Sequence, residues 1–407
     1  MNPVNRWMFS DGPERRRQVV EALVNGENNW ARLLIGMTGV DDVANGLDLR
    51  GIDLHGLDLR KARLEHANLE HANLSGVNLD GVALKYACVR NVDFSHANLS
   101  GADLTGSDLQ GVNLSGAALK GVTAKGTRFS ASNLENADFT DAQVSGADFR
   151  NCCLNGVCFE DVNANFASFS NAQAVNLRAA RGQFKKSNWF KSNLTGADLQ
   201  AVTLTEADLS FANCRSVKFS GSDMSRAKLR EAHLTDADLT GVKAVAATFA
   251  MAVLSGGKFA SADISEANFG NAYAHSPADF SKAEAVHTFF MNAHFVNCNF
   301  EHANLTRSLF CESDVTSSSF EGAILTEANL QKSNMRRTRL NHATLNRMNM
   351  NGTSLCEATL LGAKIYDTQL TPNILVGANI KGAIFARTLE SVVSESIVIG
   401  TPVYEDL

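Results

Sequence analysis

Residues 97–116 read ANLSG ADLTG SDLQG VNLSG, four consecutive five-residue units with leucine at the third position of each. The same period extends in both directions: an apolar residue recurs at every fifth position from Leu49 to Ala274 and, one residue out of step, from Phe280 to Phe385. A period of five fits neither the 3.6-residue period of an amphipathic helix nor the two-residue alternation of a strand. The pattern therefore predicts a solenoid, in which each short unit is buried against its neighbours.

A column of small residues lies two positions before the apolar one, as at Ala62, Ala67 and Ala102. Large and small side chains must therefore share a narrow interior. The residue between them is usually Asp or Asn, which favour turns. Many units also have Gly just before the small residue, as at Gly101 and Gly106, where a tight corner is tolerated.

Units such as Ala97-Asn98-Leu99-Ser100-Gly101 and Ala197-Asp198-Leu199 resemble the A(D/N)LXX signature of the pentapeptide-repeat family, over residues 47–385. The resemblance implies an all-β fold, a right-handed quadrilateral parallel β-helix with one pentapeptide per side, four per coil and about 17 coils. Residues twenty apart should then stack. This predicts two internal aromatic columns, Phe129, Phe149, Phe169 and Trp189 in one and Phe280, Phe300 and Phe320 in the other.

Three segments are expected along the chain. Residues 1–46 form a helical N-terminal leader that caps the first coil, with one helix from Ser10-Asp11-Gly12-Pro13-Glu14 to Asn25-Gly26 and a second helical stretch around Trp30 and Ile35. Residues 47–385 form the β-helix. A one-residue insertion at His275-Ser276-Pro277, near 275–278, must bulge outward or bend the stack. Residues 386–407, with Val392, Val393 and Ile397 to Ile399, form a C-terminal cap over an otherwise open strand edge.

The 407-residue chain has a formal net charge of −6 and contains no apolar run long enough for a membrane span and no secretory pattern. A bacterial cytoplasmic protein is expected, although secretion by a signal that the sequence does not reveal stays open. The eight cysteines form no CxxC pair, and six of the ten histidines (His66, His71, His96, His287, His302 and His342) share one outward corner position. No enzyme activity, catalytic residue, metal site or cofactor is therefore expected.

The leading hypothesis is a protein-binding scaffold that acts through its outer surface. Residues 177–192 contain five basic residues and no acidic one, and phenylalanines outside the interior position lie nearby. The candidate partner-binding surface comprises Arg178, Arg181, Lys185, Lys186, Phe190, Lys191, Phe166 and Phe211. Stacking places these residues on two adjacent sides over about two coils. A local bulge with solvated lysines is the structural alternative, and nucleic acid is disfavoured because one patch on an acidic protein leaves a weak electrostatic footprint.

Two other hypotheses follow from the family resemblance. The first is a DNA-mimicking protector or inhibitor of DNA gyrase or topoisomerase IV, as among the quinolone-resistance members. No series of outward residues at twenty-residue spacing is consistently acidic. Only residues 127–176, with six acidic and two basic residues, are acidic enough to imitate DNA. The second is a secreted effector, immunity protein or secretion-system accessory, in which Arg15-Arg16-Arg17 would contact a partner. The oligomeric state stays open, with a dimer through the C-terminal ends as one option, and Arg336, Arg337, Arg339 and Arg347 make a second basic region.

Overall fold

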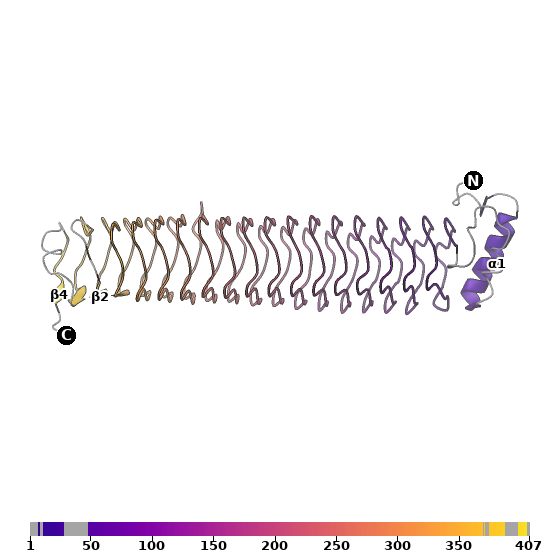
Figure 1. Ribbon diagram of the computed structural model, residues 1–407, viewed down its shortest axis with the longest axis horizontal. Helices are drawn as coiled ribbons and strands as arrows, with labels where there is room; N and C mark the ends of the chain where they lie inside the picture. Colours follow the sequence, from indigo (N-terminus) through magenta and orange to yellow (C-terminus); the bar gives the residue numbers. More distant parts are fainter. Residues whose placement is uncertain are drawn as a thin grey trace. The chain divides into compact units, whose positions relative to one another are not determined.

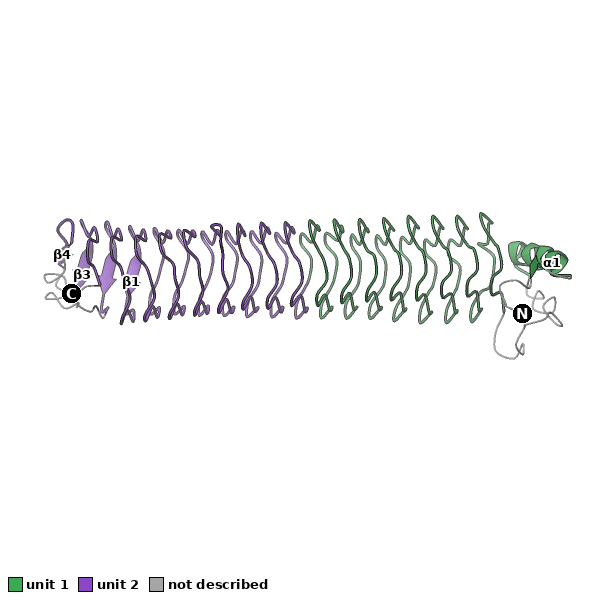
Figure 2. Ribbon diagram, turned by 90° about the horizontal axis from the view of Figure 1, so that it is seen from above, with its two compact units in different colours: residues 1–203 green, residues 204–407 purple. Residues whose placement is uncertain are grey.

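The computed structural model describes residues 7–8, 11–27, 48–368, 370, 374–386 and 398–404. The chain divides into two compact units, residues 1–203 and 204–407 (Figure 2). Each unit is built from successive coils of a right-handed quadrilateral parallel β-helix (Figure 1). The fold class implied by the resemblance to the pentapeptide-repeat family is confirmed.

Each side of a coil pairs with the same side of the next coil, twenty residues on. Asp53 pairs with Asn73 and Asn73 with Asp93, all in parallel. The Leu54 N–H donates to the Asn73 carbonyl over 2.8 Å, and the Asn73 N–H donates back to the Ile52 carbonyl over 3.0 Å. One residue per side, usually Asp or Asn, therefore forms the parallel bridges to the coils before and after it, and we call this series of bridges the ladder. The apolar neighbours of this residue point inward.

Most corners in the described part of the chain are tight turns closed by a backbone hydrogen bond. At one corner the Ala97 N–H donates to the Phe94 carbonyl over 3.0 Å, and His96 between them has φ 57°. A positive φ at the third residue of a turn favours Gly, Asn, Asp and His. The six histidines predicted at this position all have positive φ, between 55° and 59°.

Large apolar side chains fill the interior as continuous stacks. Ring centroids are 4.8 Å apart for Phe129 and Phe149, 5.0 Å for Phe149 and Phe169, and 3.9 Å for Phe169 and Trp189. In the second unit, Phe280, Phe300 and Phe320 stack at 4.9 Å intervals. Both predicted aromatic columns are confirmed.

The inserted residue lies at a corner of the second unit. His275, Ser276 and Pro277 are exposed, and the ladder continues past them with an offset of 21 residues, as in the pair Tyr273 and His294. The offset returns to 20 at the pair Asp279 and Asn299. The extra residue therefore extends outward without breaking the parallel pairing.

Helix α1, Gly12–Asn25, covers the first coil of the first unit and ends at Gly26, which has φ 72°. Val19 and Leu23 are fully buried. The Arg16 guanidinium donates to the Asp53 carboxylate over 3.0 Å, and the Trp7 Nε1–H donates to the Arg50 carbonyl over 2.9 Å. The second predicted helical stretch, residues 30–35, lies outside the described residues.

The second unit contains a parallel four-stranded sheet in the order β1-β2-β3-β4. Its strands are Thr344–Asn346, Lys364–Tyr366, Ile384–Ala386 and Val403–Tyr404. Of the predicted C-terminal cap, residues 387–397 lie outside the described residues, while Ile399 pairs with Asn379 and is exposed. In the parts of the chain that the structure describes, no helix has the length and apolarity needed to cross a membrane.

Candidate partner-binding surface

Five of the predicted residues lie at two neighbouring corners of the first unit. Phe166, Lys185 and Lys186 share one corner, where the Phe166 N–H donates to the Lys185 carbonyl over 2.9 Å. Phe190 and Lys191 form the next corner. The side between the two corners carries the paired residues Ser168 and Asn188. We call these five corner residues the basic–aromatic surface.

Phe166 is the most unusual member of this surface. It is 62% exposed and has φ 63°, a left-handed conformation that is rare for a bulky residue. Gly146 holds the same corner one coil earlier with φ 67°, so the fold itself does not require an aromatic residue there. The coil imposes this backbone conformation at corners throughout the described residues, so it is the exposed aromatic ring that makes Phe166 a candidate binding residue.

The coils beneath the surface are regular. Ala174 and Ala179 are fully buried, and the pairs Asn163 with Gln183 and Gln173 with Asn193 continue the ladder. Residues 174–192 therefore stay in the coil, and the alternative of a local bulge does not hold.

The lysines of the surface differ in their surroundings. The Lys191 ammonium lies 5.2 Å from the centroid of the half-buried Phe190 ring, a cation–π contact. The exposed Lys185 has its backbone N–H bonded to Asn165 Oδ1 over 2.8 Å. Sequence analysis missed this role of Asn165, although Asn155 and Asn341 hold corners in the same way. Among the described residues, Lys185 and Lys191 form no ion pair with a carboxylate.

Three predicted residues do not join the basic–aromatic surface. Arg178 is two sides away from Asn188 and so lies on the opposite side of the coil. Arg181 pairs with Asp161 over 2.7 Å, which raises the arginine pKa and lowers the Asp161 pKa. Phe211 is 39% exposed but belongs to the second unit.

The other basic segments are neutralised by neighbouring acids. Arg15 pairs with Asp11, Arg16 with Asp53 and Arg17 with Glu14. In the second basic region, Arg336 and Arg337 pair with Glu357, Arg339 pairs with Glu301, and Arg347 pairs with Glu327 and Asp367. These arginines therefore stabilise the surface of the fold.

The acidic segment 127–176 is also largely paired. Asp138 contacts Lys120 over 3.3 Å, and Asp148 contacts Arg150 over 2.8 Å. Asp161 is neutralised by Arg181, as described above. Few of the segment's carboxylates remain for the anionic face that a DNA mimic needs.

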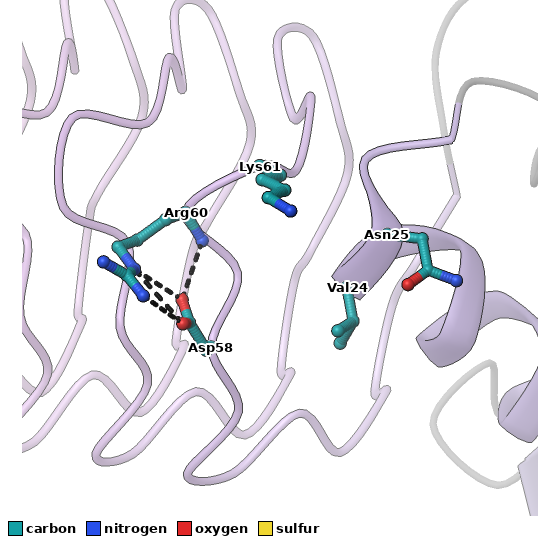
Figure 3. Close-up of a pocket in the computed structure, with 5 residues that line it drawn as sticks. All are labelled: Val24, Asn25, Asp58, Arg60 and Lys61. Carbon is teal, nitrogen blue, oxygen red and sulfur yellow. Dashed lines mark hydrogen bonds and ion pairs between the residues drawn. The ribbon is translucent and has the colours of Figure 1, made fainter.

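Two cavities in the first unit contain no catalytic constellation. One, of about 420 Å³, lies beside α1 and is lined by Val24, Asn25, Asp58, Arg60 and Lys61 (Figure 3). Its carboxylate is held by Arg60, with Nη2 and Oδ2 2.6 Å apart, and this contact lowers the Asp58 pKa to about 2. The other, of about 470 Å³, is a polar groove along the corners of Glu70, Arg90, Gln110 and Ser130.

The cysteines and histidines of the described residues form no metal-binding group of three or more ligands. All eight cysteines are free thiols. Burial raises the pKa of Cys152 and Cys214 to about 12 and that of Cys298 to about 11, so these thiols stay protonated and unreactive.

The coils, corners and exposed surfaces described above define a β-helical repeat scaffold. Residues 48–85, 87–123, 117–156, 192–230, 207–243, 232–271, 278–310, 303–341 and 333–371 match the family model described as Pentapeptide repeats. The chain therefore belongs to the pentapeptide-repeat family. Residues 157–191, which contain the whole basic–aromatic surface, lie outside the matched ranges.

Several solved structures are similar to this chain. HetL, a pentapeptide repeat protein involved in heterocyst differentiation regulation in Nostoc sp. strain PCC 7120, is 20% identical, with 68% of this chain and 90% of HetL covered and a TM-score of 0.21. The full-length fluoroquinolone resistance protein QnrB1 is 19% identical, with 53% and 84% covered and a TM-score of 0.18. Rfr23 of Cyanothece 51142 is 24% identical, with 30% and 83% covered and a TM-score of 0.14. No curated protein matches the chain.

Proposed function

We propose that this chain is a non-catalytic scaffold that binds an acidic protein partner through the basic–aromatic surface. One observation carries the proposal: the exposed Phe166 ring shares a corner with Lys185, which has no carboxylate partner in the described structure. The neighbouring corner repeats the combination with Phe190 and Lys191. Such a surface offers apolar area together with positive charge, and a protein surface with carboxylates around an apolar residue is complementary to it.

Nucleic acid and DNA mimicry fit this surface less well. The chain has a net charge of −6, and a few lysines on an acidic protein provide little phosphate neutralisation. DNA mimicry would need free carboxylates, whereas four of the six in the acidic segment pair with Lys120, Arg150 or Arg181. We propose that the binding event takes place in the cytoplasm.

The proposal is tested by affinity capture from the native lysate with a Phe166→Ser, Lys185→Glu, Lys191→Glu variant. All three side chains project at corners, so the variant should melt at nearly the same temperature as the wild type. We expect a protein bound by the wild type to be reduced at least tenfold in the variant, as measured by quantitative mass spectrometry and confirmed with the purified partner.

Lys125→Glu is the matched control, because Lys125 is exposed and holds the same corner position as Lys185 three coils earlier. It should retain the partner. Equal capture by the wild type and the triple variant would refute the proposed surface. Recovery of gyrase or topoisomerase IV subunits by both proteins would instead support the DNA-mimic hypothesis.

A further inference from the structure

The second unit carries an exposed apolar surface that the proposed function does not use. On one side of its coils, Phe289 and Leu309 follow one another at the pairing position. On the next side, Tyr273 precedes His294. The corner between these sides carries Met251 and Met291. We call Met251, Tyr273, Phe289, Met291 and Leu309 the apolar surface.

The exposure of these side chains is unusual for the fold. Met251 is 39% exposed, and Phe289 and Met291 are each 40% exposed. The same side holds Asp208, Lys228, Thr248 and Asn268 in earlier coils, so its ordinary residues are polar. Clustered exposed apolar residues mark an interaction site, and methionine adapts its shape to a partner.

Gly270 lies at the centre of the apolar surface. The Met251 N–H donates to the Gly270 carbonyl over 2.9 Å, and the Asn271 N–H donates to the Met291 carbonyl over 2.9 Å. The two methionines therefore lie one coil to either side of the glycine.

The charges at the two ends of the apolar surface have opposite sign. One coil before Met251 are two cations and one anion, Lys228, Arg230 and Glu231. One coil after Met291 are two carboxylates, Glu312 and Asp314. Within the chain Arg230 contacts Glu231 over 3.1 Å, Glu312 contacts Lys332 over 3.4 Å, and Asp314 contacts His294 over 3.5 Å. These pairs are exposed and weak, so they are open to exchange.

We infer that a second copy of this chain binds the apolar surface in an antiparallel orientation, about a two-fold axis at Gly270. This orientation places Met251 of each copy opposite Met291 of the other. It also brings the mainly cationic end of each copy to the carboxylate end of the other, whereas a parallel orientation opposes like charges. The apolar surface and its charged ends span five coils, about 19 Å at a strand spacing of about 4.8 Å. An interface this small gives weak, concentration-dependent dimers.

Sedimentation velocity over a concentration series tests the dimer. The wild type should shift from monomer to dimer as its concentration rises, and a Phe289→Asp, Met291→Asp variant should stay monomeric. Ile324→Asp is the matched control, because Ile324 is 43% exposed on a different side of the coil. A wild type that stays monomeric throughout, or a dimer that persists in the double variant, would overturn the inference.

Disulfide trapping tests the orientation. Gly270→Cys places a thiol at the two-fold axis, where it meets its copy, and its Cβ would be 3.0 Å from the flexible Asn268 Oδ1. Asn351→Cys places a thiol at the same corner position four coils away and should not cross-link. Peptide mapping must locate the disulfide at the introduced thiols. A wild-type dimer linked through Cys311, which would face its own copy only in a parallel pair, would overturn the antiparallel arrangement.

Discussion

Phe166 and Phe169 are three residues apart and occupy opposite environments. Phe169 is fully buried between Phe149 and Trp189, whereas Phe166 is 62% exposed at a corner. The five-residue period alone separates them, because only Phe169 has the spacing of the interior column. Composition-based reasoning would group both with the same aromatic cluster.

We expect Phe169→Ala to lower the free energy of unfolding by about 3–5 kcal/mol, because it leaves a cavity in a stack that cannot collapse around it. Phe166→Ala should change it by less than about 0.5 kcal/mol. Urea unfolding followed by tryptophan fluorescence measures both, with Trp189 next to the cavity as a reporter. Equal destabilisation by the two variants would contradict the assignment of Phe166 to the surface.

The corner imposes one backbone conformation on many different residue types. Its third residue takes positive φ whether it is Gly101, with φ 63°, or Lys186, with φ 56°. A tight turn is possible only in this backbone conformation, so the coil fixes the φ of the corner residue whatever its side chain. Non-glycine corners therefore carry a conformational cost that core packing offsets.

Gly126 allows the cost of backbone strain to be measured without steric clashes, because it has φ 63° and a Cβ added there would have no neighbour within 4 Å. We expect Gly126→Val to lower the free energy of unfolding by about 1–2 kcal/mol through backbone strain alone. Gly126→Asn should cost less, because asparagine tolerates the left-handed region. Chemical denaturation of the two variants makes the comparison, and equal costs for Val and Asn would contradict the strain argument.

At the scale of the whole molecule, ion pairs between neighbouring coils recur in both units. The ladder Arg307, Glu327, Arg347 and Asp367 alternates in charge at twenty-residue intervals. The hydrogen bond from Arg307 lowers the pKa of Glu327, and that from Arg337 lowers the pKa of Glu357. Bonds from Arg17 and Arg60 lower the pKa of Glu14 and Asp58 to about 2.

Because these folded-state pKa values lie below those of the unfolded chain, their stabilisation is complete above the unfolded values of about 4 and is lost as pH falls toward 2. We expect the melting temperature to be nearly constant between about pH 5 and 8 and to fall between about pH 4 and 2. Scanning calorimetry measures this profile. Glu357→Gln should lower the melting temperature at pH 7, and its difference from the wild type should vanish near pH 2. A difference that persists at pH 2 would show that the effect is not ionic.

The sequence predicted the candidate surface only in part. Lys185, Phe190 and Phe166 were identified from their departure from the repeat, but Arg181 was placed in the candidate surface although it pairs with Asp161, twenty residues earlier. The apolar surface of the second unit was missed. A signal existed, because Phe289 and Leu309 occupy the position that Asp or Asn usually holds.

The period of five by itself determined which residues lie in the interior and which lie at corners, because each position depends only on spacing that repeats along the chain. That four units make one coil, and that residues twenty apart therefore stack, followed from the resemblance to the pentapeptide-repeat family. The tertiary structure decided which charges are neutralised, since ion pairs such as Arg337 with Glu357 depend on side-chain conformations between coils. It also decided which apolar residues remain exposed. The exposure of a side chain on the outside of the coil depends on the side chains of the neighbouring coils. The repeat pattern does not specify those side chains.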